Sequence, residues 1–136
     1  MKITSKDAKE LLYSFNLENK DWITHSVCVG ESAGKIAKAL NEKGYNVDID
    51  KVITLGYLHD IGKYNGESYG HIMRGYNYLK DKGYDEEYCN ICLTHSYLNN
   101  DIMCTAGKAP NPKDNPFLVD FIKKHEYKVE EKIINI

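Results

Sequence analysis

The sequence predicts an all-α protein, built as a bundle of about six to seven helices. Apolar residues recur at three- and four-residue steps through most of the chain, which is the spacing of an amphipathic helix. No stretch shows the sustained alternation of apolar and polar residues that indicates a half-buried strand. These observations favour packed helices over a sheet or a strict coiled coil.

Glycines and polar capping residues mark the ends of the expected helices. Five helices are expected over residues 5–15, 20–43, 48–62, 68–82 and 85–97, with Ser5, Asp48 or Asp50, and Asp85 as starting residues and with Gly44 and Gly83 as stops. A sixth helix is expected to begin at Asn115 and Pro116 and to turn Phe117, Leu118, Phe121 and Ile122 inward. A seventh is expected between Tyr127 and Ile136. Residues 99–115 are expected to form an irregular loop, because Pro110 and Pro112 forbid a continuous helix.

Length and composition indicate one ordinary domain covering residues 1–136. Formal charge is −2, from 18 basic and 20 acidic residues, which argues against a dedicated nucleic-acid-binding protein. The sequence has neither a long apolar run nor a signal-peptide pattern, so we expect a cytoplasmic protein with no membrane partner. We expect the cysteines to be free thiols, with Cys89 and Cys92 on the buried side of a helix.

Four histidines, His25, His59, His71 and His95, fall on different expected helices. Three of them lie one turn from an apolar residue, where a buried neutral imidazole can bind metal. A single such histidine usually fills a core, whereas four on separate helices favour a shared metal site. Asp60 follows His59 and adds a carboxylate, and this mixture suits Fe, Mn, Zn or a similar divalent metal rather than calcium.

The order of these residues resembles the HD-domain superfamily, in particular its small bacterial members with an HDIG motif. The motif stands here as His59-Asp60-Ile61-Gly62, with His25 upstream in Trp22–Val27 and with His71 and His95 downstream. The resemblance covers about residues 20–98. It implies an HD-domain helical bundle and, as in many members, a phosphohydrolase that acts on nucleotides or other phosphate esters.

The resemblance also implies roles for individual residues. His25, His59 and Asp60 correspond to the shared metal ligands, and His71 and His95 to the additional ligands of two-metal members. Asp60 would bridge the ions, and Lys63 would contact the phosphate or the leaving group, so Asp60 and Lys63 are the expected catalytic residues. One or two divalent ions, with Fe, Mn, Zn and Mg as candidates, would activate a water for attack on phosphorus.

The end of the chain departs from the family pattern. That pattern closes with another Asp on a late helix, and residues 127–136 resemble the approach to it. We therefore expect a domain truncated at its C-terminus, with the last ligand beyond Ile136. Asp101, Asp114 and Asp120 are alternative ligands, although each is expected to be a loop or cap residue. A partner chain in a homodimer is a further candidate to supply the missing ligand.

Three functions follow as alternatives. The first is a phosphohydrolase whose partner is a small phosphorylated substrate, with a nucleotide as one candidate. The second is a metal- or ligand-binding module without turnover, because the last Asp is not found. The third is a two-iron oxygenase on the same ligands. Tyr64, Tyr69 and Tyr97 are candidates to line the pocket and stack on a base, and His125 is expected at the surface.

Overall fold

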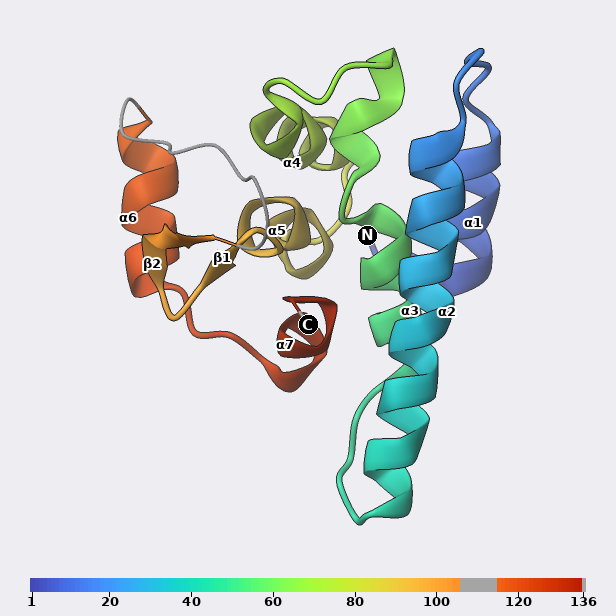
Figure 1. The fold of residues 1–136 in the computed structure, drawn as a ribbon, viewed down its shortest axis with the longest axis vertical. Helices are drawn as coiled ribbons and strands as arrows, with labels where there is room; N and C mark the ends of the chain where they lie inside the picture. Colours follow the sequence, from blue (N-terminus) through green and yellow to red (C-terminus); the bar gives the residue numbers. More distant parts are fainter. Residues whose placement is uncertain (106–114, 136) are drawn as a thin grey trace.

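The computed structural model describes residues 1–105 and 115–135 of the chain, and its described part is dominated by helices (Figure 1). The elements follow in the order α1 (Ser5–Tyr13), α2 (Asp21–Glu42), α3 (Ile49–Leu58), the 3-10 helix η1 (Ile61–Asn65), α4 (His71–Asp81), α5 (Glu86–Thr94), β1 (Tyr97–Leu98), β2 (Asp101–Thr105), α6 (Pro116–Lys124) and α7 (Val129–Asn135). The all-α prediction is confirmed.

Side-chain caps mark the starts of α1, α3 and α6, whereas α2, α4 and α5 begin without one. Asp48 caps α3 by accepting a hydrogen bond from the backbone N–H of Lys51 at 3.0 Å, and Asn115 caps α6 through the N–H of Leu118 at 3.1 Å. The prediction that Ser5 caps the first helix is wrong. Thr4 accepts the hydrogen bond from the Asp7 N–H, while the Ser5 side chain donates to Asp50 at the start of α3.

The long helix α2 and helix α3 run antiparallel and in close contact (Figure 1). Gly30 and Gly56 make this possible, because a Cβ on Gly56 would lie 2.5 Å from the Cα of Gly30. Real side chains never approach so closely, so both positions need glycine. The crossing brings His25, five residues before Gly30, to the same end of the pair as His59, three residues after Gly56.

Three predicted helix ends lie elsewhere in the structure. Helix α3 ends at Leu58 rather than at Gly62, and η1 follows it as a separate turn. Helix α4 begins at His71 rather than Ser68, after Gly70 in a left-handed conformation. Helix α5 ends at Thr94, short of the predicted Tyr97. In each case the shortening places a histidine of the predicted cluster at a helix terminus.

A two-stranded antiparallel hairpin, β1–β2, follows α5 and was not predicted. Its turn is Asn99 and Asn100, which both have positive φ, a conformation that asparagine tolerates better than most residues. The strands are too short to show a periodic pattern, with five residues in β2 and two in β1. The region predicted as an irregular loop therefore begins with this hairpin.

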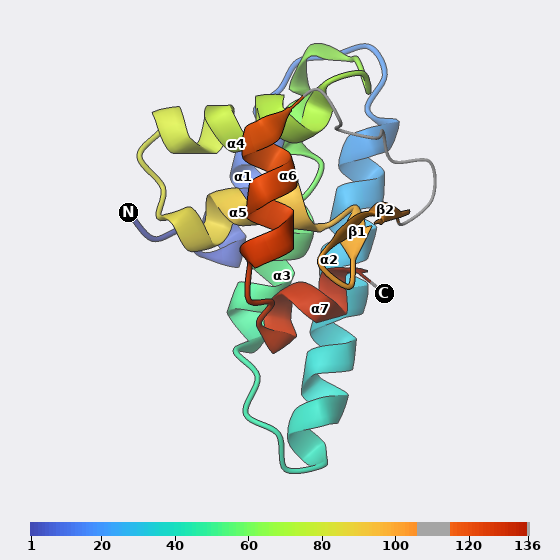
Figure 2. The same cartoon turned by 90° about the vertical axis from the view of Figure 1, so that its left-hand side faces the viewer.

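The C-terminal helices α6 and α7 cover α5 and α3 (Figure 2). Leu118 and Ile122 of α6 are buried as predicted, but Phe117 is 48% exposed, so its predicted inward position is wrong. His125 is likewise not a surface residue. Its Nε2 lies 2.6 Å from the buried carboxylate of Glu131 on α7, which ties the two helices together.

The cysteines are free thiols, and Cys89 and Cys92 are buried on α5, as predicted. Burial raises the pKa of the Cys89 thiol to about 11 and that of Cys92 well above the ordinary value, so neither is a reactive thiolate near neutral pH. Among the described helices, none has the length and hydropathy needed to cross a bilayer.

Candidate metal centre

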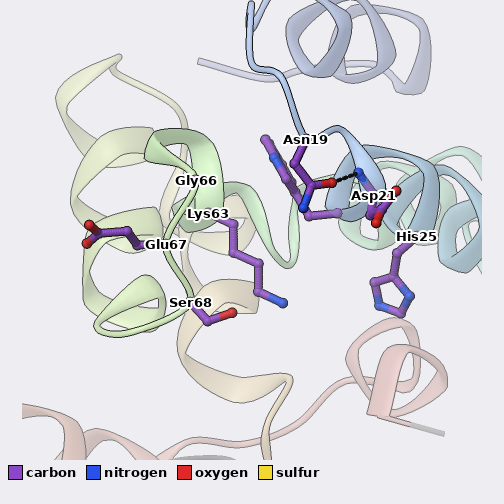
Figure 3. A pocket seen from close by; sticks show the side chains of 8 residues that line it. Asn19, Asp21, His25, Lys63, Gly66, Glu67 and Ser68 are labelled. Carbon is purple, nitrogen blue, oxygen red and sulfur yellow. Dashed lines mark hydrogen bonds between the residues drawn. The ribbon is translucent and has the colours of Figure 1, made fainter.

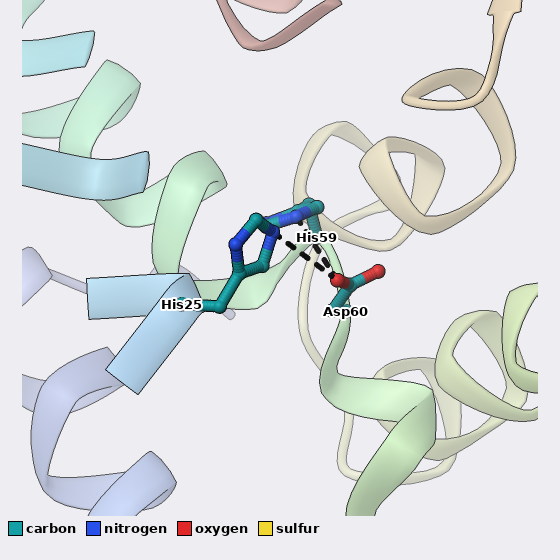
Figure 4. Close-up of side chains that lie close together, drawn as sticks. All are labelled: His25, His59 and Asp60. Atoms are coloured by element: carbon teal, nitrogen blue, oxygen red, sulfur yellow. Dashed lines mark ion pairs between the residues drawn. The ribbon is translucent and has the colours of Figure 1, made fainter. Parts of the chain in front are cut away.

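Asp60 lies at the junction of α3 and η1, and its Oδ2 atom faces two imidazoles. The Nε2 atom of His59, the preceding residue, is 3.2 Å from Oδ2, and the Nε2 atom of His25 on α2 is 3.7 Å away (Figure 4). Two ligands bound about 2.1 Å from one ion are roughly 3 to 3.5 Å apart. The spacing of these three atoms is therefore close to that of a shared metal ion.

The other carboxylate oxygen of Asp60 faces a second pair of imidazoles. Oδ1 lies 3.3 Å from Nε2 of His71, the first residue of α4, and 3.3 Å from Nε2 of His95 at the end of α5. Asp60 is thus shared between two three-residue groups, each able to hold a metal ion. A carboxylate in this position can bridge two ions.

Backbone carbonyls fix the orientation of three of the rings. The Nδ1 atom of His59 lies 2.6 Å from the Gly56 oxygen, that of His71 lies 2.8 Å from the Ser68 oxygen, and that of His95 lies 3.0 Å from the Ile91 oxygen. A carbonyl can only accept, so Nδ1 donates and Nε2 faces Asp60. Such outer partners are what hold metal-binding histidines in one tautomer and one orientation.

Gly62 brings His71 to the carboxylate. A Cβ at residue 62 would lie 1.8 Å from the His71 carbonyl oxygen and 2.7 Å from the Gly75 nitrogen, so η1 and the start of α4 are in direct backbone contact. Asp60 and His71, at the two ends of the intervening loop, are consequently close together. This is the structural reason for the glycine at the fourth position of the His-Asp-Ile-Gly motif.

The carboxylate of Asp60 stays ionised. Burial by itself would raise its pKa, but the close side chains of His59, His71 and His95 together hold the pKa well below the usual range. Burial lowers the pKa of His95 against the opposing effect of Asp60, and burial with the neighbouring His59 lowers the pKa of His25. Near neutral pH these histidines are therefore free bases able to bind metal.

A pocket of about 310 Å³ opens between His25 and Lys63 (Figure 3), the two pocket residues whose side-chain nitrogens lie near Asp60 Oδ2. One wall is the start of α2 and the residues before it, and the other is the segment from η1 to α4; the lining residues are Asn19, Asp21, Trp22, His25, Lys63, Gly66, Glu67 and Ser68. The amine of Lys63 lies 3.3 Å from Asp60 Oδ2. In Figure 3 Lys63 and Ser68 point into the space that His25 faces from the opposite wall.

The structure brings together the five predicted metal ligands, with Lys63 beside them. It does not bring the alternative carboxylates to them: Asp101 accepts from the Met103 N–H, Asp120 pairs with Lys124, and Asp114 lies outside the described residues. The candidates Tyr64, Tyr69 and Tyr97 are not among the described residues that line this pocket, and Tyr64 packs instead on Phe15 and Tyr78.

Trp22 and Ser68 are pocket residues that sequence reasoning missed. Each lies three residues before a cluster histidine, Trp22 before His25 and Ser68 before His71. On a helix this spacing places Trp22 on the face that carries His25, so the signal was present in the sequence. Ser68 is in a loop, where spacing carries no such information.

The comparison with known families agrees with this geometry. The family model described as the HD domain matches residues 22–134, most of the chain. The chain belongs to the HD-domain family. HD-domain proteins bind divalent metals and are typically metal-dependent phosphohydrolases.

An uncharacterized protein of Methanocaldococcus jannaschii is 35% identical over 80 residues, which are 59% of this chain and 47% of that protein. The chain thus spans about half the length of this curated relative. No solved structure is significantly similar to this chain.

Protonation of His25 and His95 is expected to weaken metal binding as the pH falls below the ordinary histidine range. A protonated imidazole cannot bind metal, and the lowered pKa values of His25 and His95 move their protonation below the ordinary value of 6.5. The apparent affinity for Zn²⁺ should therefore be nearly constant from about pH 8 to 7 and fall below about pH 6. Calorimetric titrations across this range measure it, and a steep loss already between pH 8 and 7 would contradict it.

Proposed function

We propose that this HD-domain protein is a metal-dependent phosphohydrolase that acts on a small phosphate ester, with a nucleotide as one candidate. The observation that carries the proposal is the position of the Asp60 carboxylate between two pairs of imidazoles. Oδ1 faces His71 and His95, whereas Oδ2 faces His25 and His59 and also lies near Lys63. This arrangement suits binding of an anionic group beside two cations.

The residues present fit a pair of divalent ions. His25, His59 and Asp60 would hold one ion, and Asp60, His71 and His95 the other. Four imidazoles and one carboxylate favour Fe, Mn or Zn over Mg, which prefers oxygen ligands. When bound, the ions would supply a hydroxide near neutral pH and neutralise charge on the phosphoryl oxygens.

The chain's own residues would bind and orient the substrate. The Lys63 ammonium points into the pocket beside Asp60, where it can pair with a phosphoryl oxygen and stabilise charge as the leaving group departs (Figure 3). Asn19, Asp21 and Ser68 offer hydrogen-bonding groups to the remainder of the ester. Behind this wall Trp22 packs on Phe15, with ring centroids 5.8 Å apart, which stiffens the pocket.

The same pocket favours esters of low negative charge. Among the described residues that line it, Lys63 is the one lysine, whereas Asp21 and Glu67 are acidic, with the Glu67 carboxylate turned away from Lys63 (Figure 3). A single phosphoryl group can be neutralised by the ions and Lys63, but a triphosphate chain would extend toward the carboxylate of Asp21. We therefore place phosphate monoesters ahead of polyphosphates as substrates.

The test is phosphate release from a panel of monoesters and nucleotides by the chain loaded separately with Mn²⁺, Fe²⁺ and Zn²⁺. The proposal expects turnover of at least one monoester and its loss after chelation. Fully loaded protein that releases no phosphate from any ester would support the binding module instead. Substrate-dependent oxygen uptake by the Fe²⁺ form without phosphate release would support the oxygenase.

A further inference from the structure

Arg74 lies on α4, close in sequence to the predicted ligand His71, and its side chain binds two backbone oxygens. It is the only arginine in the sequence, and it comes three residues after His71. Its Nε donates to the Gly62 carbonyl at 2.6 Å, and its Nη2 donates to the Glu67 carbonyl at 2.7 Å. No carboxylate of the described residues forms an ion pair with it, so this guanidinium is committed to two backbone oxygens.

The two carbonyls belong to the segment that joins the halves of the site. Residues 62–68 run from the glycine that contacts His71 to the pocket wall, and the Ser68 carbonyl at their end accepts from His71 Nδ1. Their other described hydrogen bonds are local, such as Gly66 N–H to Lys63 and Glu67 N–H to the Asn65 side chain. Arg74 is therefore the long-range connection that fixes this segment to α4.

Glu67 is held by its backbone rather than by its side chain. In Figure 3 its carboxylate points away from Lys63 and Ser68, while its carbonyl is bound to Arg74. A planar guanidinium carries several N–H groups in a fixed fork and can donate to two carbonyls at once. A lysine, with one compact ammonium, cannot reproduce this geometry.

We propose that Arg74 is a positioning residue, which holds residues 62–68 on α4 so that the Ser68 carbonyl orients His71 and the pocket wall stays beside Lys63. The proposal rests on the proposed function in one respect, that His71 binds one of two ions. It predicts a selective effect: loss of Arg74 disturbs the His71/His95 ion and leaves the His25/His59 ion almost unchanged.

The experiment compares Arg74→Met and Arg74→Lys with the parent chain and with Lys80→Met, which removes an exposed positive charge from the same helix. Metal-free proteins are titrated with Mn²⁺. The binding step that is lost in His25→Ala is assigned to the His25/His59 ion, and the step that is lost in His71→Ala is assigned to the His71/His95 ion. Loss of an outer partner of a ligating histidine typically weakens binding 10–100-fold. We expect Arg74→Met to weaken the His71/His95 step by roughly tenfold, Arg74→Lys to weaken it less, and Lys80→Met to match the parent.

Equal weakening of both steps, or no weakening of either, would overturn the proposal. A parent chain that binds no Mn²⁺ would defeat the proposed function, and backbone hydrogen exchange of the metal-free proteins then decides the role of Arg74. In Arg74→Met the amides of Gly66 and His71 should exchange faster, while that of His95, at the end of α5, should not. Unchanged exchange at Gly66 and His71 would show that Arg74 positions nothing.

Discussion

Asp60→Asn is expected to abolish two-metal binding and to reduce phosphate-ester hydrolysis by a factor on the order of 10³ or more. Asn has nearly the shape of Asp but only one oxygen and no charge. Each ion would therefore lose an anionic ligand, since Oδ1 and Oδ2 face different imidazole pairs. Elemental analysis of the purified protein and initial rates at matched metal concentration measure the two effects.

A matched control separates this effect from a general loss of charge. Asp120 is an exposed carboxylate on α6 that pairs with Lys124, so Asp120→Asn should keep both the metal content and the rate. Replacing one histidine of either imidazole pair with alanine should remove mainly the ion that this pair binds. Retention of two tightly bound ions in Asp60→Asn would show that Asp60 does not bridge them.

The two halves of the site differ in exposure, and this bears on where a substrate binds. The His25 side chain is 57% exposed, whereas those of His71 and His95 are 14% and 9% exposed. Lys63 and the pocket are on the His25 side. Under the proposed function, an ester that enters through the pocket would therefore meet an ion held by His25 and His59 first, and His71 and His95 would lie behind Asp60.

The site could be predicted from the sequence because several weak signals occur together there. No histidine alone is informative, but His25, His59, Asp60, His71 and His95 in this order indicate the family and predict a shared metal site. The helices were predictable for the same reason, since apolar periodicity accumulates over many residues. Helix α2, with 22 residues, was predicted almost to its ends.

What could not be predicted depends on contacts between distant segments. The cap at Thr4 rather than Ser5 is decided partly by Asp50, 45 residues away from Ser5, which takes the serine hydroxyl. The burial of His125 depends on Glu131 of a separate helix, and the hairpin after α5 is too short to have a pattern. His59, His71 and His95 lie at helix ends, and each ring binds a nearby carbonyl, a local contact that periodicity does not encode.

Gly62→Ala is expected to cost about 3 kcal/mol in the free energy of unfolding and to displace the His71/His95 ion. The added Cβ would overlap the His71 carbonyl at 1.8 Å and press on the Gly75 nitrogen, both of them backbone atoms that cannot rotate away. Overpacking of a buried contact typically costs 1–3 kcal/mol, and about 3 kcal/mol is the upper part of that range. Denaturant unfolding of the metal-free chain measures the cost, and metal titration measures the displacement.

Gly66→Ala is the matched control for this change, since Gly66 lies four residues further along the same segment. Its φ of +86° makes alanine unfavourable by about 1–2 kcal/mol, but no atom of the described residues beyond its two chain neighbours lies within 4 Å of the added Cβ. This variant should therefore lose some stability and still bind both ions. If Gly62→Ala unfolds no more easily than Gly66→Ala and keeps its second ion, then the contact between η1 and α4 does not place His71. The cluster would in that case be held by α5 and by Asp60 itself, because His95 reaches the same oxygen from a different helix.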